Sequence, residues 1–185
     1  MAELRAGRPV VIDDGHGQRL AFIALDSSTR SSYTAFAGVA AGQHYLFLTA
    51  TRARVLGVAA EDGARVPLAG VDFDALPSLS YLREAVPMPA GWSAGQALDA
   101  GAVEVARLGL LLPAMVGVLL APDDTRFDSC AQVSLCDLQQ GAEQAAHAYE
   151  LVARSPVPLR DVGMTEFAVF RGGVAQRDQV AIIVG

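Results

Sequence analysis

The feature that most constrains the fold of this chain is the alternation of short apolar runs with segments of helical periodicity. Residues 9–13 (PVVID) and 45–48 (YLFL) have the length and apolar content of buried strands. Residues 94–111 carry apolar side chains at near-helical spacing, and Pro113 separates them from another apolar run at 115–120. This alternation predicts an α+β domain or an α/β sandwich, in which helices pack on a mixed sheet.

The remaining elements of this domain are predicted from the same two patterns and from the turn residues between them. We expect further strands at 19–25 and 133–135, and helices at 33–41, at 49–56 after a threonine cap, and at 137–153 after an aspartate cap. Prolines and glycines are frequent between 59 and 91, where we expect loops and one short element near 79–85.

The C-terminal part changes character at residues 155–158 (SPVP), which we expect to break the chain. The strand patterns at 165–170 and 179–184 flank glycines and predict a C-terminal β-hairpin. We therefore divide the chain into residues 1–154 and residues 155–185. An isolated hairpin is only marginally stable, and its last strand reaches the end of the sequence, so we expect the natural protein to continue.

Composition and charge exclude several classes of function. The net charge of −6 argues against nucleic-acid binding, which normally needs a basic surface. The chain contains no lysine, so Schiff-base and phosphate-loop lysine chemistry is excluded. The apolar run at 108–121 is shorter than the ~20 residues of a membrane span, and the first residues lack the apolar core of a signal peptide. We therefore expect a cytoplasmic protein that does not bind membranes.

Metal and cofactor sites are weakly supported by the sequence. Cys130 and Cys136 have no further cysteines beside them, and the three histidines are scattered, so we expect reduced thiols and no zinc site. Gly15 and Gly17 lack the third glycine of a dinucleotide-binding loop, because Leu20 stands in its place. No bound cofactor or metal is therefore predicted.

The one acidic group with catalytic potential directly follows the first predicted strand. Asp13, Asp14 and His16 would lie at the carboxyl end of that strand, where active sites of α/β folds are often found. Oxygen ligands assisted by a histidine nitrogen could hold a divalent cation there. The sequence DDGHG is equally typical of a polar turn, and the sequence leaves both readings open.

Three stretches of the chain resemble 3,4-dihydroxy-2-butanone 4-phosphate synthase, an enzyme family of riboflavin synthesis. They are residues 4–14 (LRAGRPVVIDD), 48–57 (LTATRARVLG) and 103–108 (VEVARL), the last followed by a leucine, a proline and an alanine. The tail is similar to the start of GTP cyclohydrolase II, at 157–159, 166–171 and 178–181. The resemblance as a whole is to the region that precedes the cyclohydrolase in some bacterial proteins, and it implies a synthase-like fold and a homodimer.

The resemblance fails at the residues that carry the synthase chemistry. The family's acidic loop binds magnesium and handles protons on ribulose 5-phosphate, but here no carboxylate follows Asp13 and Asp14 through residue 22. The family's His-Thr-Glu, which supplies a metal ligand, is replaced by Leu98-Asp99-Ala100. The middle of the chain also lacks the segment that helps to hold the substrate phosphate. Proton abstraction next to a carbonyl needs a positioned base and a metal, so the synthase activity is predicted to be lost.

Cyclohydrolase activity is not expected of this chain either. The resemblance implies that the zinc cysteines and the GTP-binding residues of that family lie beyond the last residue here. Cys130 and Cys136 precede the cyclohydrolase-like tail and do not match those ligands. Cys130 and Cys136 are therefore not predicted to be a zinc site.

Three hypotheses about function follow from these comparisons of residues. The first is a non-catalytic structural or oligomerisation domain of a GTP cyclohydrolase II, fused to it or separate from it. The second is a magnesium-dependent enzyme acting on a sugar phosphate, with Asp13, Asp14 and His16 as catalytic residues. The third is a domain that senses a metabolite in the old substrate pocket, with Arg19 or Arg107 binding a phosphate.

Overall fold

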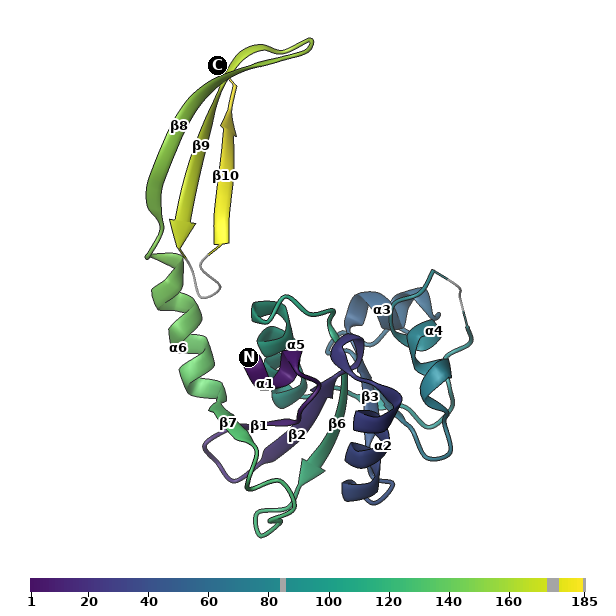
Figure 1. The fold of residues 1–185 in the computed structure, drawn as a ribbon. Coiled ribbons are helices and arrows are strands. Elements are labelled where there is room, and N and C mark those ends of the chain that lie inside the picture. Colours follow the sequence, from purple (N-terminus) through teal and green to yellow (C-terminus); the bar gives the residue numbers. More distant parts are fainter. Residues whose placement is uncertain (84–85, 173–176, 185) are drawn as a thin grey trace. The chain divides into compact units, whose positions relative to one another are not determined.

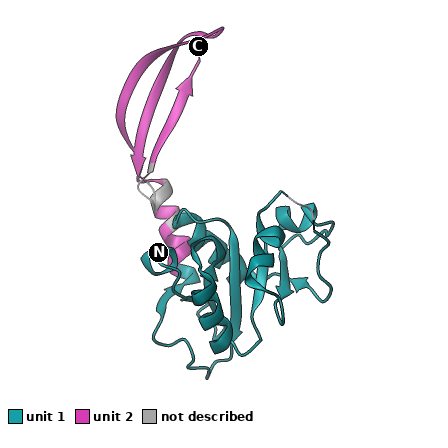
Figure 2. Ribbon diagram, turned by 45° about the vertical axis from the view of Figure 1, so that its right-hand side comes forward, with its two compact units in different colours: residues 1–136 teal, residues 137–185 magenta. Residues whose placement is uncertain are grey.

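The computed structural model describes residues 1–83, 86–172 and 177–184. The chain divides into two compact units, Met1–Cys136 and Asp137–Gly185, which Figure 2 shows in different colours. Its strands form two separate sheets, one of seven strands and one of three. No helix in the described part of the chain is long and apolar enough to cross a membrane.

The seven-stranded sheet is mixed and has the strand order β5-β4-β3-β6-β2-β1-β7. All neighbouring strands are antiparallel except β1 and β7, which run parallel. The strands are β1 (Val10–Asp13), β2 (Arg19–Ala24), β3 (Tyr45–Leu48), β4 (Ala64–Pro67), β5 (Ser93–Ala94), β6 (Ala114–Leu120) and β7 (Ala131–Ser134). The predicted fold class, a mixed sheet with packed helices, is confirmed.

Helices cover both faces of this sheet (Figure 1). The α-helices are α1 (Ala2–Arg5), α2 (Arg30–Val39), α3 (Ala50–Val55), α4 (Leu76–Ser80) and α5 (Ala97–Leu108), with 3-10 turns at Leu25–Ser27 and Phe73–Ala75. Side chains alternate along each strand, so Val11 packs with Tyr33 and Phe36 of α2, whereas Ile12 lies against Gly101 of α5. The sheet is therefore the middle layer between α2 and α5.

Side-chain caps explain where the helices of this unit begin. Thr29 and Ser32 form a capping box for α2, in which each side chain accepts a hydrogen bond from the backbone amide of the other, at 3.1 and 2.9 Å. A threonine cap was expected here at Thr49 or Thr51, and Thr49 caps α3 by accepting from the Arg52 amide at 3.4 Å. At the start of α5 the Asp99 carboxylate accepts from the amide of Gln96 at 2.8 Å. This cap fixes Asp99 at the first turn of α5.

The second unit contains most of α6 (Leu135–Ala146) and an antiparallel sheet of the order β10-β9-β8. Its strands are β8 (Glu150–Leu159), β9 (Gly163–Gly172) and β10 (Arg177–Ile183). β9 is central and holds the two most buried side chains of this sheet, Thr165 and Ala168. The predicted hairpin strands are confirmed as β9 and β10, while residues 173–176 of its turn lie outside the described residues.

Within the first unit the prediction of loops across 59–91 is wrong at β4. Residues 64–67 (ARVP) are too short and too polar to show a strand pattern, yet they pair with β3 on one side and β5 on the other. The pairing and burial come from the neighbouring strands, which the local sequence does not reveal. The short element predicted near 79–85 is α4, which lies earlier; residues 84–85 are outside the described residues.

The helix and the break predicted near the end of the chain are also wrong in part. The helix expected over 137–153 ends at Ala146, and β8 runs through the expected break at 155–158. Proline is tolerated there because β8 is an edge strand, which needs hydrogen bonds on one side only. Residues 154 and 155 thus lie inside one strand, and the two compact units divide after Cys136. The assignment of 1–154 and 155–185 to two families stays a prediction.

Candidate functional site

Asp13, Asp14 and His16 share one surface turn between β1 and β2. Asp13 Oδ1 accepts a hydrogen bond from the Gly15 amide at 3.1 Å. Asp14 Oδ1 accepts from the amides of His16 and Gln18, at 2.8 and 3.0 Å. These hydrogen bonds, chiefly the one from His16, hold the pKa of Asp14 below its usual value. Both carboxylates therefore accept hydrogen bonds from backbone amides of their own turn, as is typical of aspartates in polar turns.

The sequence left two predictions open at this turn, a divalent-cation site and a polar turn. The structure describes all three side chains, and in the described residues no group of three or more His, Cys, Asp or Glu side chains is placed to hold a metal ion. Asp13, Asp14 and His16 are thus close along the chain without forming such a group.

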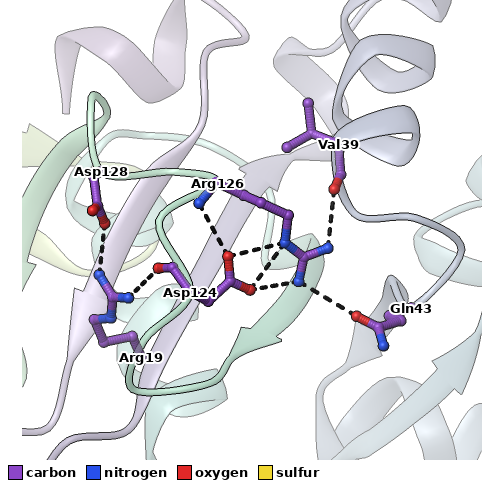
Figure 3. A network of polar contacts seen from close by, with 6 residues as sticks. All are labelled: Arg19, Val39, Gln43, Asp124, Arg126 and Asp128. Carbon is purple, nitrogen blue, oxygen red and sulfur yellow. Dashed lines mark hydrogen bonds and ion pairs between the residues drawn. The ribbon is translucent and has the colours of Figure 1, made fainter.

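Arg19 begins β2 and is engaged by the loop that follows β6 (Figure 3). Its guanidinium donates to Asp128 Oδ1 at 2.9 Å and to the carbonyl oxygen of Asp124. The Arg19 side chain is 19% exposed, so these protein groups cover most of it. Arg19 therefore ties the loop to the sheet, and its charge is already balanced by Asp128.

Arg126 ties the same loop to the end of α2 (Figure 3). It forms an ion pair with Asp124 at 2.6 Å and donates to the carbonyl oxygen of Val39 at 3.0 Å and to Gln43 Oε1 at 3.4 Å. The hydrogen bonds from Arg126 lower the pKa of Asp124 to about 2. A cation at the carboxyl end of a helix is also favourable for the helix dipole. This network is a structural clamp on the loop.

Arg107, the other arginine considered for phosphate binding, lies on the exposed side of α5. It forms an ion pair with Glu104 of the same helix at 2.5 Å. The Arg107 side chain is 69% exposed, so water weakens this pair considerably. Neither Arg19 nor Arg107 lines either of the two pockets described below.

A buried polar cluster surrounds Asp99, which is 1% exposed. Asp99 Oδ1 accepts from the Tyr45 hydroxyl at 2.7 Å. Asp99 Oδ2 accepts from Arg65 Nε at 2.7 Å and from the Gln96 amide, and it forms an ion pair with Arg65 Nη2 at 2.6 Å. Arg65 Nη2 donates to Gln96 Oε1 at 3.2 Å. The Arg65 guanidinium also lies 5.0 Å from the centre of the Tyr45 ring. Burial and the Asp99 charge raise the pKa of Tyr45, so this hydroxyl stays protonated.

Two pockets open beside this cluster. The first, of about 580 Å³, has the polar lining Thr49, Glu61, Asp62 and Gln96. This lining holds two carboxylates and no arginine, which is unfavourable for a phosphate ester. The second, of about 460 Å³, is lined in part by Tyr45 and Arg65. Its one cation, Arg65, is the residue already paired with Asp99.

His44 is a second buried polar group that the sequence analysis did not single out. Its Nε2 lies 3.2 Å from the Tyr33 hydroxyl, and the two rings meet edge to face. His44 Nδ1 is buried without a hydrogen-bond partner in the structure. Burial lowers the pKa of His44, because a buried imidazolium would lose its hydration.

Sequence reasoning named Asp99 only through the family resemblance and did not identify Tyr45, Arg65 or His44. The spacing of Gln96 and Asp99 at the start of a predicted helix is a signal of a capping box, which could have marked Asp99 as a structural residue. Arg65 carried no such signal, because β4 was not predicted. Cys130 is half-buried, which raises the pKa of its thiol, and it is a free cysteine.

Comparison with known sequences shows that the whole chain is similar to curated proteins named GTP cyclohydrolase-2. No protein-family model matches it. Two curated proteins named GTP cyclohydrolase-2 match all of it over 186 residues, with 51% identity for Xylella fastidiosa strain Temecula1 and 52% for strain 9a5c. The chain spans about half the length of these relatives, 46% of each. The predicted resemblance to GTP cyclohydrolase II proteins is confirmed.

The solved structures with a similar fold are 3,4-dihydroxy-2-butanone 4-phosphate synthases, the other family that the sequence resembles. A two-domain 3,4-dihydroxy-2-butanone 4-phosphate synthase from A. baumannii aligns with all of this chain and 68% of its own, with a TM-score of 0.53 and 15% identity. The corresponding synthase of Candida albicans aligns with 75% of this chain and 93% of its own, with a TM-score of 0.52 and 14% identity. At such identities the likeness establishes the fold, and the predicted synthase-like fold is confirmed.

Proposed function

We propose that this chain is a non-catalytic domain serving a GTP cyclohydrolase II of riboflavin biosynthesis, because all of the chain matches a part of proteins named GTP cyclohydrolase-2. Its role is to stabilise and oligomerise that enzyme, to which it is fused or with which it associates as a separate chain. The domain forms a homodimer in the cytoplasm and binds neither nucleic acid nor membrane. It retains the synthase fold and has lost the synthase reaction.

The observation that carries this proposal is the environment of Asp99. Asp99 lies in the segment where the synthase family is expected to supply a metal ligand. An ionised carboxylate offers about four lone-pair sites. Asp99 already accepts three hydrogen bonds, from the Tyr45 hydroxyl, Arg65 Nε and the Gln96 amide, and it is ion-paired with Arg65 Nη2. Releasing an oxygen to a metal would leave Arg65 as an uncompensated buried cation. Asp99 thus supports the fold within a segment from which the synthase family is expected to supply a metal ligand.

The surrounding groups support the same conclusion. The carboxylates of Asp13 and Asp14 accept hydrogen bonds from their own turn, and the larger pocket presents carboxylates where a sugar phosphate would need cations. Arg19, one of the residues considered for metabolite sensing, is balanced by Asp128. The magnesium-enzyme and sensor hypotheses therefore find less support among these contacts than the structural role.

The absence of synthase activity is tested with the purified chain, Mg²⁺ and ribulose 5-phosphate. We expect no formate release and no rise in melting temperature with either compound. Magnesium-dependent formate release, abolished by Asp13→Asn or Asp14→Asn, would establish an active enzyme and overturn the proposal. A melting-temperature rise with ribulose 5-phosphate or inorganic phosphate, without formate release, would favour the metabolite-sensing role instead.

The structural role is tested in the full-length Xylella fastidiosa relative. Removing the 186 residues that match this chain should lower its thermal stability and reduce its oligomeric size in sedimentation measurements. An asparagine at the position aligned with Asp99 should also lower stability, with GTP hydrolysis at low temperature unchanged. If the shortened protein keeps both its oligomeric size and its melting temperature, the region does not have the proposed role.

A further inference from the structure

The three-stranded sheet of the second unit has one face with an uncharged centre. The register sets Val180 opposite Val169 and Ile182 opposite Phe167, and directly opposite residues in antiparallel strands share a face. On the other side of β9, Ala153 lies opposite Val169. The apolar face, as we call it below, consists of Ala153, Ser155, Phe167, Val169, Val180 and Ile182.

The ion-paired side chains described on this sheet lie around the apolar face or behind it. Arg171 and Asp178 form an ion pair at 2.8 Å, one step along each strand from Val169 and Val180 on the same face. Arg154 pairs with Glu166 at 2.7 Å, and both point to the opposite face because each precedes or follows an apolar-face residue directly. An apolar centre with a polar rim is the composition of a protein–protein interface.

Side chains of the apolar face are open to solvent on β10. Val180 and Ile182 are 54% and 53% exposed. A sheet must bury its apolar face against another element to be stable, and a sheet of three strands has little other burial to rely on. The exposed face therefore points to a further layer of protein.

The two edges of this sheet differ in a way that also points to a partner. The β8 edge contains Pro156 and Pro158, which lack amide hydrogens and discourage pairing with another strand. β10 contains no proline, and within the described residues it pairs with β9 alone. An apolar edge strand without such protection is a template for a further strand. Growth of the sheet is thus open beyond β10 and blocked beyond β8.

We propose that the apolar face and the outer edge of β10 form the docking surface for the part of a GTP cyclohydrolase-2 protein that has no counterpart in this chain. This inference rests on the proposed function and gives that function its contact surface. More than half of each curated relative is unmatched, which is enough protein to supply both a covering layer and a further strand. The uncharged face and the net charge of −6 do not suit nucleic acid or an anionic membrane.

Hydrogen exchange can test this docking, with the isolated chain compared to the full-length Xylella fastidiosa relative. The amides of β10 should exchange about tenfold more slowly in the full-length protein, because docking adds local stability. Lysine is then introduced into the full-length protein at the position aligned with Ile182. The exchange of β10 should return toward that of the isolated chain.

A neighbouring position supplies the matched control. Ile183 is 47% exposed and lies on the opposite face of the same strand, so a lysine at its aligned position should leave the slow exchange of β10 within about twofold. Equal exchange of β10 in the isolated and full-length proteins would overturn the inference. So would a dimer of the isolated chain that Ile182→Lys dissociates and Ile183→Lys does not, since a second copy would then occupy the face. Neither result depends on formate release, so the docking surface and the loss of synthase activity fail separately.

Discussion

Asp99 and Arg65 illustrate, at the residue scale, how an ion pair becomes part of the core of this fold. Both are almost closed to solvent, and the Tyr45 hydroxyl, the Tyr45 ring and the Gln96 amide complete the surroundings of the pair. Two buried charges are tolerated because they compensate each other and are hydrogen-bonded to their surroundings. Removing one partner leaves the other charge in the interior without compensation.

The substitution Asp99→Asn should lower the free energy of unfolding by about 3–5 kcal/mol, because Arg65 remains charged and buried. Urea denaturation of the purified chain measures this change. Glu104→Gln on the same helix is the control: its exposed pair with Arg107 is expected to contribute about 0.2–1 kcal/mol. Similar losses in the two variants would contradict a special role of the buried pair.

His44 should make the stability of the chain depend on pH. Burial lowers its pKa, whereas the imidazole of the unfolded chain titrates near about 6.5. As the pH falls below about 6.5 the unfolded chain takes up the proton first, so the free energy of unfolding decreases. His44→Gln should reduce this slope between about pH 6.5 and 5 in denaturation curves. An unchanged slope in His44→Gln would contradict the prediction.

At the scale of elements, local signals set the beginnings of helices, and packing against neighbours sets which short segments become strands. Thr29 and Thr49 cap α2 and α3 through their own side chains, so those starts are properties of a few adjacent residues. β4 exists because β3 and β5 pair with it, and β8 accepts prolines because it lies at an edge.

The cap of α2 gives a prediction of stability at this scale. Thr29→Ala removes one half of the capping box and should destabilise the chain by about 1 kcal/mol, measured by urea denaturation. Thr34 lies within the same helix, is exposed, and donates only to the Arg30 carbonyl. Thr34→Ala should therefore leave stability unchanged or raise it slightly. An equal loss of stability in both variants would mean that helix propensity, and not the cap, determines the effect of the substitution.

The contact between α5 and the sheet gives a second prediction of stability. A methyl group added at Gly101 would come within 2.7 Å of side-chain carbons of Ile12 and Leu135, so Gly101→Ala should cost about 1–3 kcal/mol through overpacking. Gly38 in α2 has open space around it, and Gly38→Ala should stabilise the chain by about 0.5–1 kcal/mol. Thermal denaturation of both variants measures the difference, and a stabilising Gly101→Ala would show that α5 can move away.

For the whole molecule, the two compact units differ in how they bury apolar surface. The first encloses a large apolar cluster between helices and a seven-stranded sheet, whereas the three-stranded sheet keeps Val180 and Ile182 in solvent. An element with an apolar face gains stability when another element covers that face. This difference agrees with a chain that matches about half of its relatives' length.

Hydrogen exchange of the isolated chain should reveal this difference directly. The amides of β6, which has a strand on each side and buried side chains on both faces, should exchange slowest. The amides of β10, at an open edge with exposed side chains, should exchange much faster. Comparable protection of β6 and β10 would mean that β10 is already covered in the isolated chain.

The amino-acid sequence by itself determined the mixed α and β character, the positions of β1, β3 and β6, the cap of α3 and the relation to two enzymes of riboflavin synthesis. The elements and the cap follow from contiguous residues, whose apolar periodicity and capping groups act over a few positions. The relation to the two enzymes follows from the resemblance of several short motifs. The tertiary structure decided the rest: β4, the course of β8 through two prolines, and the role of Asp99. Each depends on a group distant in sequence, as Asp99 depends on Tyr45 and Arg65. The neighbouring chain supplies Asp99 with the Gln96 amide alone, and the fold brings it the side chains of Tyr45 and Arg65, which make it a core residue.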